Sequence, residues 1–196
     1  MSWQHRRPRR AFAPAPAENA VVTAISNNDR RHLAHLLASG ANPDAPHRDT
    51  CPIVFAAHRG ETDIIDLLLA HKADINRKDA TGMTALMAAV STRKHDLARA
   101  LIDRGAAPDL QDNAGRTALL HAVFKKDHEA VALLVRAGAV AAIPDKDGKT
   151  ATDYLGQPEN AGLRATFEAA QKDADKIDTA AASRIVLRKP LHIRPK

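Results

Sequence analysis

Apolar and polar residues recur with a helical period along most of the chain. Residues 64–69 are apolar except at Asp66, and Asp63 precedes them. Spacings of three and four residues gather such apolar side chains on one face of a helix and leave the acids on the other. The same pattern returns in residues 97–102 and 130–135. Each of these segments is therefore predicted to be a short helix with one buried face.

These segments stand 33 residues apart, and a second set of positions along the chain recurs with the same spacing. Thr84, Thr117 and Thr150 are separated by 33 residues, and the same step back from Thr84 reaches Cys51. Three of the four positions precede an apolar run: Pro-Ile-Val-Phe-Ala-Ala, Ala-Leu-Met-Ala-Ala-Val and Ala-Leu-Leu-His-Ala-Val. The run after Thr150 is a degraded copy. The chain is thus a series of copies, each with a second short helix predicted at its start.

Glycines and turn motifs separate the predicted helices. Gly60 lies between the two helices of one copy, and Gly105 and Gly138 follow second helices, where glycine can adopt a positive φ. An Asp-x-x-Gly pattern at 112–115 and 145–148 supplies a turn before the next Thr. Each copy is predicted to be a helix, a turn, a helix and a projecting loop, and helices this short need neighbouring copies for stability.

The period and the Thr-initiated motif are similar to those of ankyrin repeats. The resemblance covers roughly residues 18–172 and implies an all-α ankyrin-repeat solenoid of about five helix-turn-helix repeats with projecting hairpin loops. We expect an atypical cap at each end of the array. The repeats are expected near residues 18–45, 46–78, 79–111, 112–144 and 145–172.

The copies depart from the family motif at two positions. The motif's Pro is kept only at Pro52. The motif's His is replaced in four copies by Val54, Met87, Leu120 and Asp153. In the family, that His and the Thr hydroxyl tie the turn together by hydrogen bonds, so the array is expected to be less rigid than an ideal one.

Charge is unevenly distributed along the chain. The 29 Lys and Arg residues outnumber the 23 Asp and Glu residues, for a formal net charge of +6. Residues 1–17 and 181–196 hold nine of these bases and no acid, which leaves 20 bases against 23 acids, or −3, in residues 18–180. The repeats are therefore mildly acidic, and an interaction with nucleic acid is confined to the tails.

The repeats are expected to be flanked by a basic N-terminal arm at residues 1–17 and a basic C-terminal tail at 173–196. Each is either a disordered solubilising segment or a contact for phosphates or an acidic membrane surface. The C-terminal tail is also a candidate to dock as an extended strand on the repeats, which carry the opposite charge. No apolar segment of about 20 residues is present, and no apolar stretch separates the N-terminal arginines from a cleavage-like site. A cytoplasmic location is expected.

Candidate catalytic and metal-binding residues are few. His32 and His35 have a spacing compatible with two metal ligands on one helix face, but no motif places a third ligand beside them, so they are interpreted as surface histidines. His58 is expected in a turn. Cys51 is the only cysteine and is expected to fill a half-buried space. No nucleophile constellation or phosphate-binding glycine motif occurs, so no catalytic residue, cofactor or metal is predicted.

The resemblance implies that a partner protein binds on the concave surface formed by the loops and the first helices. Carried over one copy at a time, the candidate contact positions are His47, Arg48, Thr50, His58, Arg59, Thr81, Met83, Ser91, Thr92, Asn113, Arg116, Phe124, Lys125, Lys146, Asp147 and Lys149. Phe124 is the most distinctive, because its column otherwise holds polar residues. It is either an exposed binding anchor beside Arg116 or a side chain folded over the next repeat.

Asn76 raises a further alternative, because residues 68–76 are similar to ankyrin sites modified by an asparaginyl hydroxylase in animals. The other interpretation is that Asn76 braces its loop. The predicted function is a non-enzymatic protein-binding module, an adaptor, scaffold or inhibitor, that is monomeric when free. The alternatives are a binder of nucleic acid or acidic membrane acting through the tails, and a structural subunit of a larger assembly.

Overall fold

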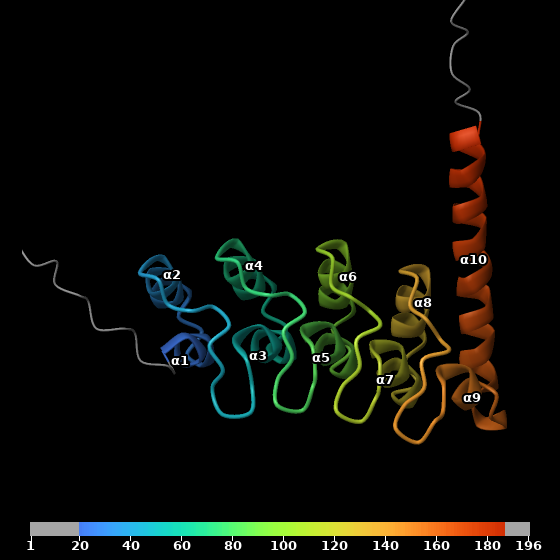
Figure 1. Ribbon diagram of the computed structural model, residues 1–196, viewed down its shortest axis with the longest axis horizontal. Helices are drawn as coiled ribbons and strands as arrows, with labels where there is room; N and C mark the ends of the chain where they lie inside the picture. Colours follow the sequence, from blue (N-terminus) through green and yellow to red (C-terminus); the bar gives the residue numbers. More distant parts are fainter. Residues whose placement is uncertain (1–19, 187–196) are drawn as a thin grey trace, which may run out of the picture.

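A computed structural model describes the backbone of residues 20–186 and the side chains of residues 20–176. Within this part the regular elements are helices, stacked as a row of helix pairs (Figure 1). The fold is an all-α ankyrin-repeat solenoid, as the resemblance implies. The predicted N-terminal arm and the last ten residues of the C-terminal tail lie outside the described residues, and so does the proposed docking of that tail.

The helices form two layers. The first helices of the repeats are α1 (Ala20–Ser26), α3 (Pro52–Arg59), α5 (Ala85–Ser91), α7 (Ala118–Phe124) and α9 (Ala151–Leu155). The second helices are α2 (Arg30–Ala38), α4 (Thr62–Ala70), α6 (His95–Asp103), α8 (His128–Arg136) and α10 (Ala161–Val186), with a short 3-10 helix, η1 (Pro158–Asn160), before α10. Each first helix contacts the first helix of the next repeat, and the loops between repeats project from the side of the first helices (Figure 1).

The recurring threonine is the N-cap of three first helices, α5, α7 and α9. The hydroxyl of Thr84 accepts a hydrogen bond from the backbone N–H of Met87 at 3.3 Å, and Thr117 and Thr150 do the same for the residues three positions on. The copy after Thr150 keeps a full capping box, because the Asp153 carboxylate also accepts the Thr150 N–H at 2.8 Å. Although the sequence motif after Thr150 is degraded, the N-terminus of α9 is therefore still capped.

The core lies between the two layers and combines many alanines with larger leucine and isoleucine side chains. Helix α5 is buried from Ala85 to Val90, and its alanines allow the neighbouring first helices to approach closely. Met87 and Leu120, which replace the motif's His, are buried, so these positions contribute apolar burial in place of a hydrogen bond. Cys51 is only 2% exposed, more buried than the half-buried position predicted for it, and this burial raises the pKa of its thiol.

Two expectations differ from the structure. His58 lies within α3 rather than in a turn, because the helix continues to Arg59 and ends at Gly60, whose φ is +80°. Helix α10 runs through residue 172 to Val186, so the boundary expected there between the repeats and the C-terminal tail falls inside a helix. The helix extends past α8 and leaves the row of repeats (Figure 1).

Candidate partner-binding surface

Four loop tips, at residues 47–50, 79–83, 112–116 and 145–149, are called fingers here. In three of them an aspartate at the start organises the turn. Asp112 Oδ1 accepts the backbone N–H groups of Ala114 at 2.8 Å and Arg116 at 2.9 Å, and Asp79 and Asp145 make the equivalent pairs of bonds. The carboxylate thus accepts hydrogen bonds from backbone N–H groups that the turn would otherwise leave without an acceptor. These three fingers therefore share the same pair of side-chain hydrogen bonds.

Neighbouring fingers are joined by backbone hydrogen bonds. The N–H of Ala80 donates to Asp49 O at 2.9 Å, that of Asn113 to Thr81 O at 2.9 Å, and that of Lys146 to Ala114 O at 3.0 Å. The contact is close enough to require glycine: a Cβ on Gly115, whose φ is +77°, would lie 2.8 Å from the backbone nitrogen of Lys146. The four fingers therefore form a continuous edge rather than independent loops.

In the fourth and fifth repeats the second carboxylate oxygen ties the finger to the first helix. His121 Nε2 lies 2.9 Å from Asp112 Oδ2, and the Tyr154 hydroxyl donates to Asp145 Oδ2 at 2.8 Å. Burial lowers the pKa of His121 despite the opposing effect of Asp112, so the neutral ring donates from Nε2. The bond to Asp145 raises the pKa of the Tyr154 hydroxyl.

Neither His121 nor Tyr154 was among the predicted site residues. The signal was present in the sequence, since each lies nine residues after the finger aspartate that it contacts. The matching position in the third repeat is Ala88, which has no polar side-chain atom. The same repeat position thus holds Ala88, His121 and Tyr154 in turn. Polar side chains at a position that is otherwise apolar could have been noticed in the sequence.

Phe124 stands at the centre of an aromatic and basic cluster. Its ring is 41% exposed and meets Tyr154 of the next repeat edge to face, with the ring centroids 4.7 Å apart. The Arg116 guanidinium carbon lies 5.0 Å from the Phe124 centroid, and Lys149 Nζ lies 5.7 Å from the Tyr154 centroid. Both interpretations of Phe124 thus describe part of its environment, because the ring contacts the next repeat and is still exposed.

All sixteen predicted contact residues lie on a finger or at the C-terminal end of a first helix. Several also have local hydrogen bonds: the Ser91 and Thr92 hydroxyls donate to Ala88 O, and the Asn113 side chain donates to Ala80 O at 2.8 Å. A half-buried position is found for His47, Thr50, Met83 and Ser91. An exposed position is found for Arg48, His58, Arg59, Thr81, Thr92, Asn113, Arg116, Phe124, Lys125, Lys146, Asp147 and Lys149.

The second repeat holds a separate, smaller group of an aromatic and a basic side chain. The Arg59 guanidinium carbon lies 5.9 Å from the centroid of the Phe55 ring, and Arg59 also pairs with Glu61. Between this group and the Phe124 cluster, the third repeat presents smaller side chains such as Ser91 and Thr92. The predicted surface is therefore not uniform, and its aromatic residues gather at two places.

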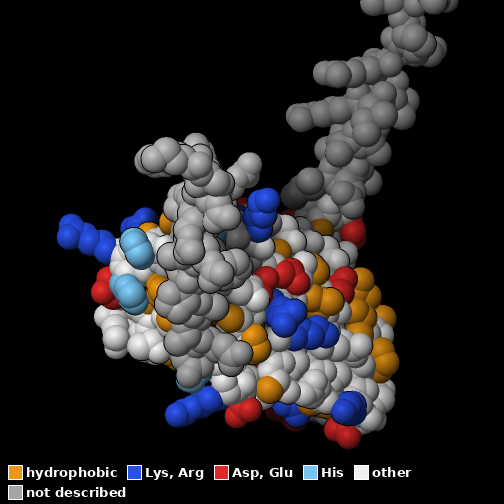
Figure 2. Space-filling model, turned by 60° about the vertical axis from the view of Figure 1, so that its left-hand side comes forward, with side chains coloured by type: hydrophobic (Ala, Val, Ile, Leu, Met, Phe, Trp, Pro, Cys, Tyr) orange, Lys and Arg blue, Asp and Glu red, His pale blue; other side chains and the backbone are white. Residues whose placement is uncertain are grey.

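The second helices carry ion pairs that bridge adjacent repeats. Arg30 Nη1 lies 2.9 Å from Asp63 Oδ2, and Arg104 Nε lies 2.8 Å from Asp66 Oδ1. Arg136 similarly meets Asp173 of α10 at 3.1 Å. Figure 2 shows basic and acidic side chains interspersed over the face that it displays, with hydrophobic side chains between them. Three arginines on or next to the second helices are thus each paired with an aspartate of an adjacent repeat.

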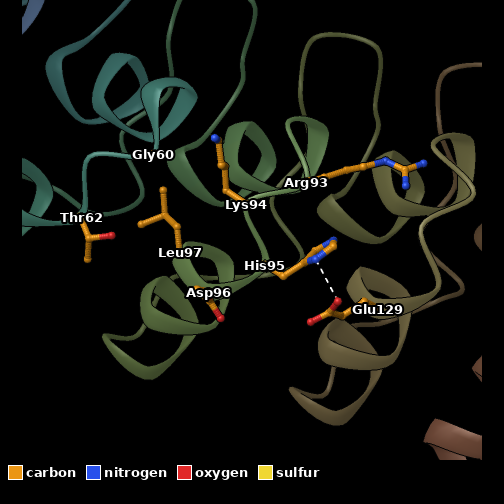
Figure 3. A pocket seen from close by; sticks show the side chains of 8 residues that line it. All are labelled: Gly60, Thr62, Arg93, Lys94, His95, Asp96, Leu97 and Glu129. Atoms are coloured by element: carbon orange, nitrogen blue, oxygen red, sulfur yellow. Dashed lines mark ion pairs between the residues drawn. The ribbon is translucent and has the colours of Figure 1, made fainter.

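A shallow pocket lies between α4, α6 and α8, bordered by Gly60, Thr62 and Lys94, with His95 pointing toward Glu129 (Figure 3). His95 Nδ1 lies 3.0 Å from Glu129 Oε2, and Nε2 lies 2.7 Å from Oδ2 of the buried Asp127. Burial alone would raise the pKa of Asp127, but the hydrogen bonds from His95 and from the Ala130 N–H outweigh it, and the pKa is lowered. These contacts are those of a capped helix start braced by the preceding repeat.

Other candidate sites resolve in the structure as surface or bracing positions. His32 and His35 are exposed on α2, and the described residues contain no group of three or more His, Cys, Asp or Glu side chains that could hold a metal. Asn76 Oδ1 accepts the Ala107 N–H of the next repeat at 2.9 Å and so braces its loop. Within the described range, none of the helices is long and apolar enough to cross a membrane.

A family model for ankyrin repeats, in three copies, matches residues 21–112. Relatives include an L-asparaginase of Dirofilaria immitis, 35% identical over 46% of this chain and 16% of that protein. An ankyrin repeat-containing protein of Treponema pallidum (strain Nichols) is 33% identical over 51% and 34%, and the ARF GTPase-activating protein Git of Drosophila melanogaster 36% over 34% and 9%. The chain spans about a third or less of the length of these relatives, whose names differ widely, so the matches point to a shared repeat segment and to no single activity.

Proposed function

Because the chain is an ankyrin-repeat protein, and such repeats generally serve as protein-protein interaction modules, we propose that it binds a partner protein without catalysis of its own. The binding surface consists of the fingers and the exposed ends of α3, α5, α7 and α9, and is called the finger surface below. An adaptor, a scaffold and an inhibitor would each work by occupying it.

The observation that carries this proposal is the exposed ring of Phe124. It is held by Tyr154 on one side and by Arg116 on the other, so little side-chain freedom remains to be lost when a partner covers it. Aromatic and arginine side chains held in this way are the residue types that dominate binding energy in protein interfaces. The hydrogen-bonded edge of the fingers supplies a rigid support for them.

The free protein is proposed to be monomeric. Among the described residues the exposed large hydrophobic side chains are Phe124 and Val140, the latter 47% exposed. Two such side chains fall short of the extended apolar area that an obligate dimer buries. Phe124 and Val140 also provide a matched pair of positions for testing the proposal.

The test is capture of partners from an extract of the native host, with identification by mass spectrometry, using the wild-type, Phe124→Ala and Val140→Ala proteins. We expect Phe124→Ala to weaken the main interaction by about 2 kcal/mol or more, which is typical of a binding anchor, and Val140→Ala to leave it unchanged. A change below about 0.5 kcal/mol for Phe124→Ala would remove it as an anchor.

A second version of the experiment separates the finger surface from the tails. Proteins lacking residues 1–17 or 181–196 are expected to retain the partner. Capture that needs the tails and disappears steeply as salt is raised would favour the alternative, a binder of nucleic acid or acidic membrane, because release of counterions makes such binding strongly salt-dependent.

A further inference from the structure

In the fourth and fifth repeats, the basic side chains of the finger surface have no carboxylate partner among the described residues, whereas three arginines on or next to the second helices do. Arg30, Arg104 and Arg136 each meet an aspartate of the following or preceding repeat. Over the described residues, no carboxylate lies within ion-pair distance of Arg116 or Lys149, nor of the neighbouring Lys125 and Lys146. These four cations lie in the fourth and fifth repeats, where the aromatic cluster is found.

Three carboxylates of these two repeats are engaged in hydrogen bonds within the repeats. Asp112 binds two backbone N–H groups with one oxygen and His121 with the other, and Asp145 does the same with Tyr154. Asp153 accepts the N–H and the hydroxyl of Thr150. These hydrogen bonds hold the three carboxylates within the repeats, and none of the three makes an ion pair with Arg116 or Lys149.

The cations also have a defined arrangement. Arg116 and Lys149 occupy the same position in adjacent fingers, and each lies over an aromatic ring of the Phe124–Tyr154 pair. A guanidinium stacked on a ring keeps the N–H groups at its edge available, and this edge matches both oxygens of a carboxylate. The cluster therefore places one cation over the exposed Phe124 ring and a second over the Tyr154 ring that Phe124 contacts.

We propose that the finger surface of the fourth and fifth repeats binds an acidic segment of a partner protein. Two carboxylates of that segment meet Arg116 and Lys149, and an apolar side chain between them covers Phe124. The inference rests on the proposed function and adds the chemistry of the partner to it. An opposite charge on the partner speeds encounter and fixes register, while the apolar contact supplies most of the affinity.

A protein segment fits this surface better than a nucleic acid. Residues 18–180 carry a net charge of −3, and the exposed Asp147 lies in the same finger as Lys149. A nucleic acid carries a phosphate on every nucleotide, so the negative charge of the repeats would repel it along its whole length. A peptide can place two carboxylates at the two cations and neutral residues elsewhere.

The test is a selection of random 12-residue peptides displayed on phage, carried out on the full-length protein. Selected peptides are then measured by fluorescence anisotropy against wild type, the double variant Arg116→Gln/Lys149→Gln and Phe124→Ala. The control is Arg99→Gln/Lys172→Gln, which removes the same charge from exposed positions on α6 and α10. Circular dichroism establishes that each variant is folded, and a 12-nucleotide single-stranded DNA is titrated in parallel.

We expect the selected peptides to be enriched in Asp and Glu around an apolar residue. Their dissociation constants should rise about tenfold or more in the double variant and in Phe124→Ala, and less than about twofold in the control. Peptides without acidic enrichment that lose affinity only in Phe124→Ala would overturn the acidic partner and leave the proposed function in place. Failure to obtain any peptide whose binding depends on Phe124 would overturn both the acidic partner and the proposed function. Tighter binding of the DNA through Arg116 and Lys149 would show that the ligand of this surface is a nucleic acid and not a peptide.

Discussion

Replacement of Asp112 by Ala tests whether one carboxylate organises the fourth finger. The substitution removes three hydrogen bonds: to the N–H groups of Ala114 at 2.8 Å and Arg116 at 2.9 Å, and to His121 Nε2 at 2.9 Å. At about 1 kcal/mol of net stabilisation for each bond, the free energy of unfolding should fall by about 3 kcal/mol. The ring of His121 is left half-buried without its acceptor, which adds to the effect.

The measurement is urea unfolding followed by circular dichroism, with Asp112→Asn and Asp103→Ala as comparisons. Asp112→Asn keeps an oxygen that can accept the two backbone N–H groups, so we expect it to lose only about 1 kcal/mol. Asp103 is exposed at the end of α6 and has no hydrogen-bond partner among the described residues, so its loss should change stability by less than about 0.5 kcal/mol. A loss below about 1 kcal/mol for Asp112→Ala would refute the reasoning, because it would mean that the finger keeps its conformation without the carboxylate.

Two further predictions concern pH and the helix cap. Because burial lowers the pKa of His121, its contribution to stability is complete above the ordinary histidine pKa of about 6.5 and is lost as the pH falls below that value. The free energy of unfolding should therefore decrease between pH 7.5 and 5.5, and less so in His121→Tyr, which copies the Tyr154–Asp145 pair; equal slopes in both proteins would contradict this assignment. Cys51 begins α3 without a side-chain cap, so Cys51→Thr should supply a hydroxyl to accept the Val54 N–H and stabilise the protein by about 1 kcal/mol. A lower midpoint of thermal unfolding would show instead that the buried site cannot take the threonine methyl group.

Much of the fold was predictable because each repeat restates the same local information. The columns of Thr84 and Thr117 predicted helix starts, and the hydroxyls of both residues cap α5 and α7. The burial of Cys51 was harder to predict. It stands where the other repeats have threonine, and its identity alone says little about how closely the neighbouring helices approach it. The extent of α10 was also missed, because the last repeat was expected to end near residue 172, whereas the helix begins after η1 and continues to Val186.

The candidate site was predictable in position and less so in composition. Its sixteen residues lie on fingers and first-helix ends, because the alignment of copies already separates core columns from variable ones. His121 and Tyr154 escaped because they sit in a first-helix column that is filled by Ala88 in the third repeat. Their role depends on reaching the free oxygen of a finger aspartate, and that requires knowing how the finger folds back over the helix.

By itself, the sequence determined the number and kind of helices in a repeat and the face that each one buries. These features follow from apolar residues at helical spacing and from capping residues, and both act within a few residues of one another. Only the tertiary structure decided which side chains meet across repeats, such as Phe124 with Tyr154 and Arg104 with Asp66. Those contacts depend on the distance and rotation between stacked repeats, which the packing of all the core side chains sets together. The contacts within the exposed cluster around Phe124, where Arg116 and Lys149 lie over the two rings, are a consequence of that stacking.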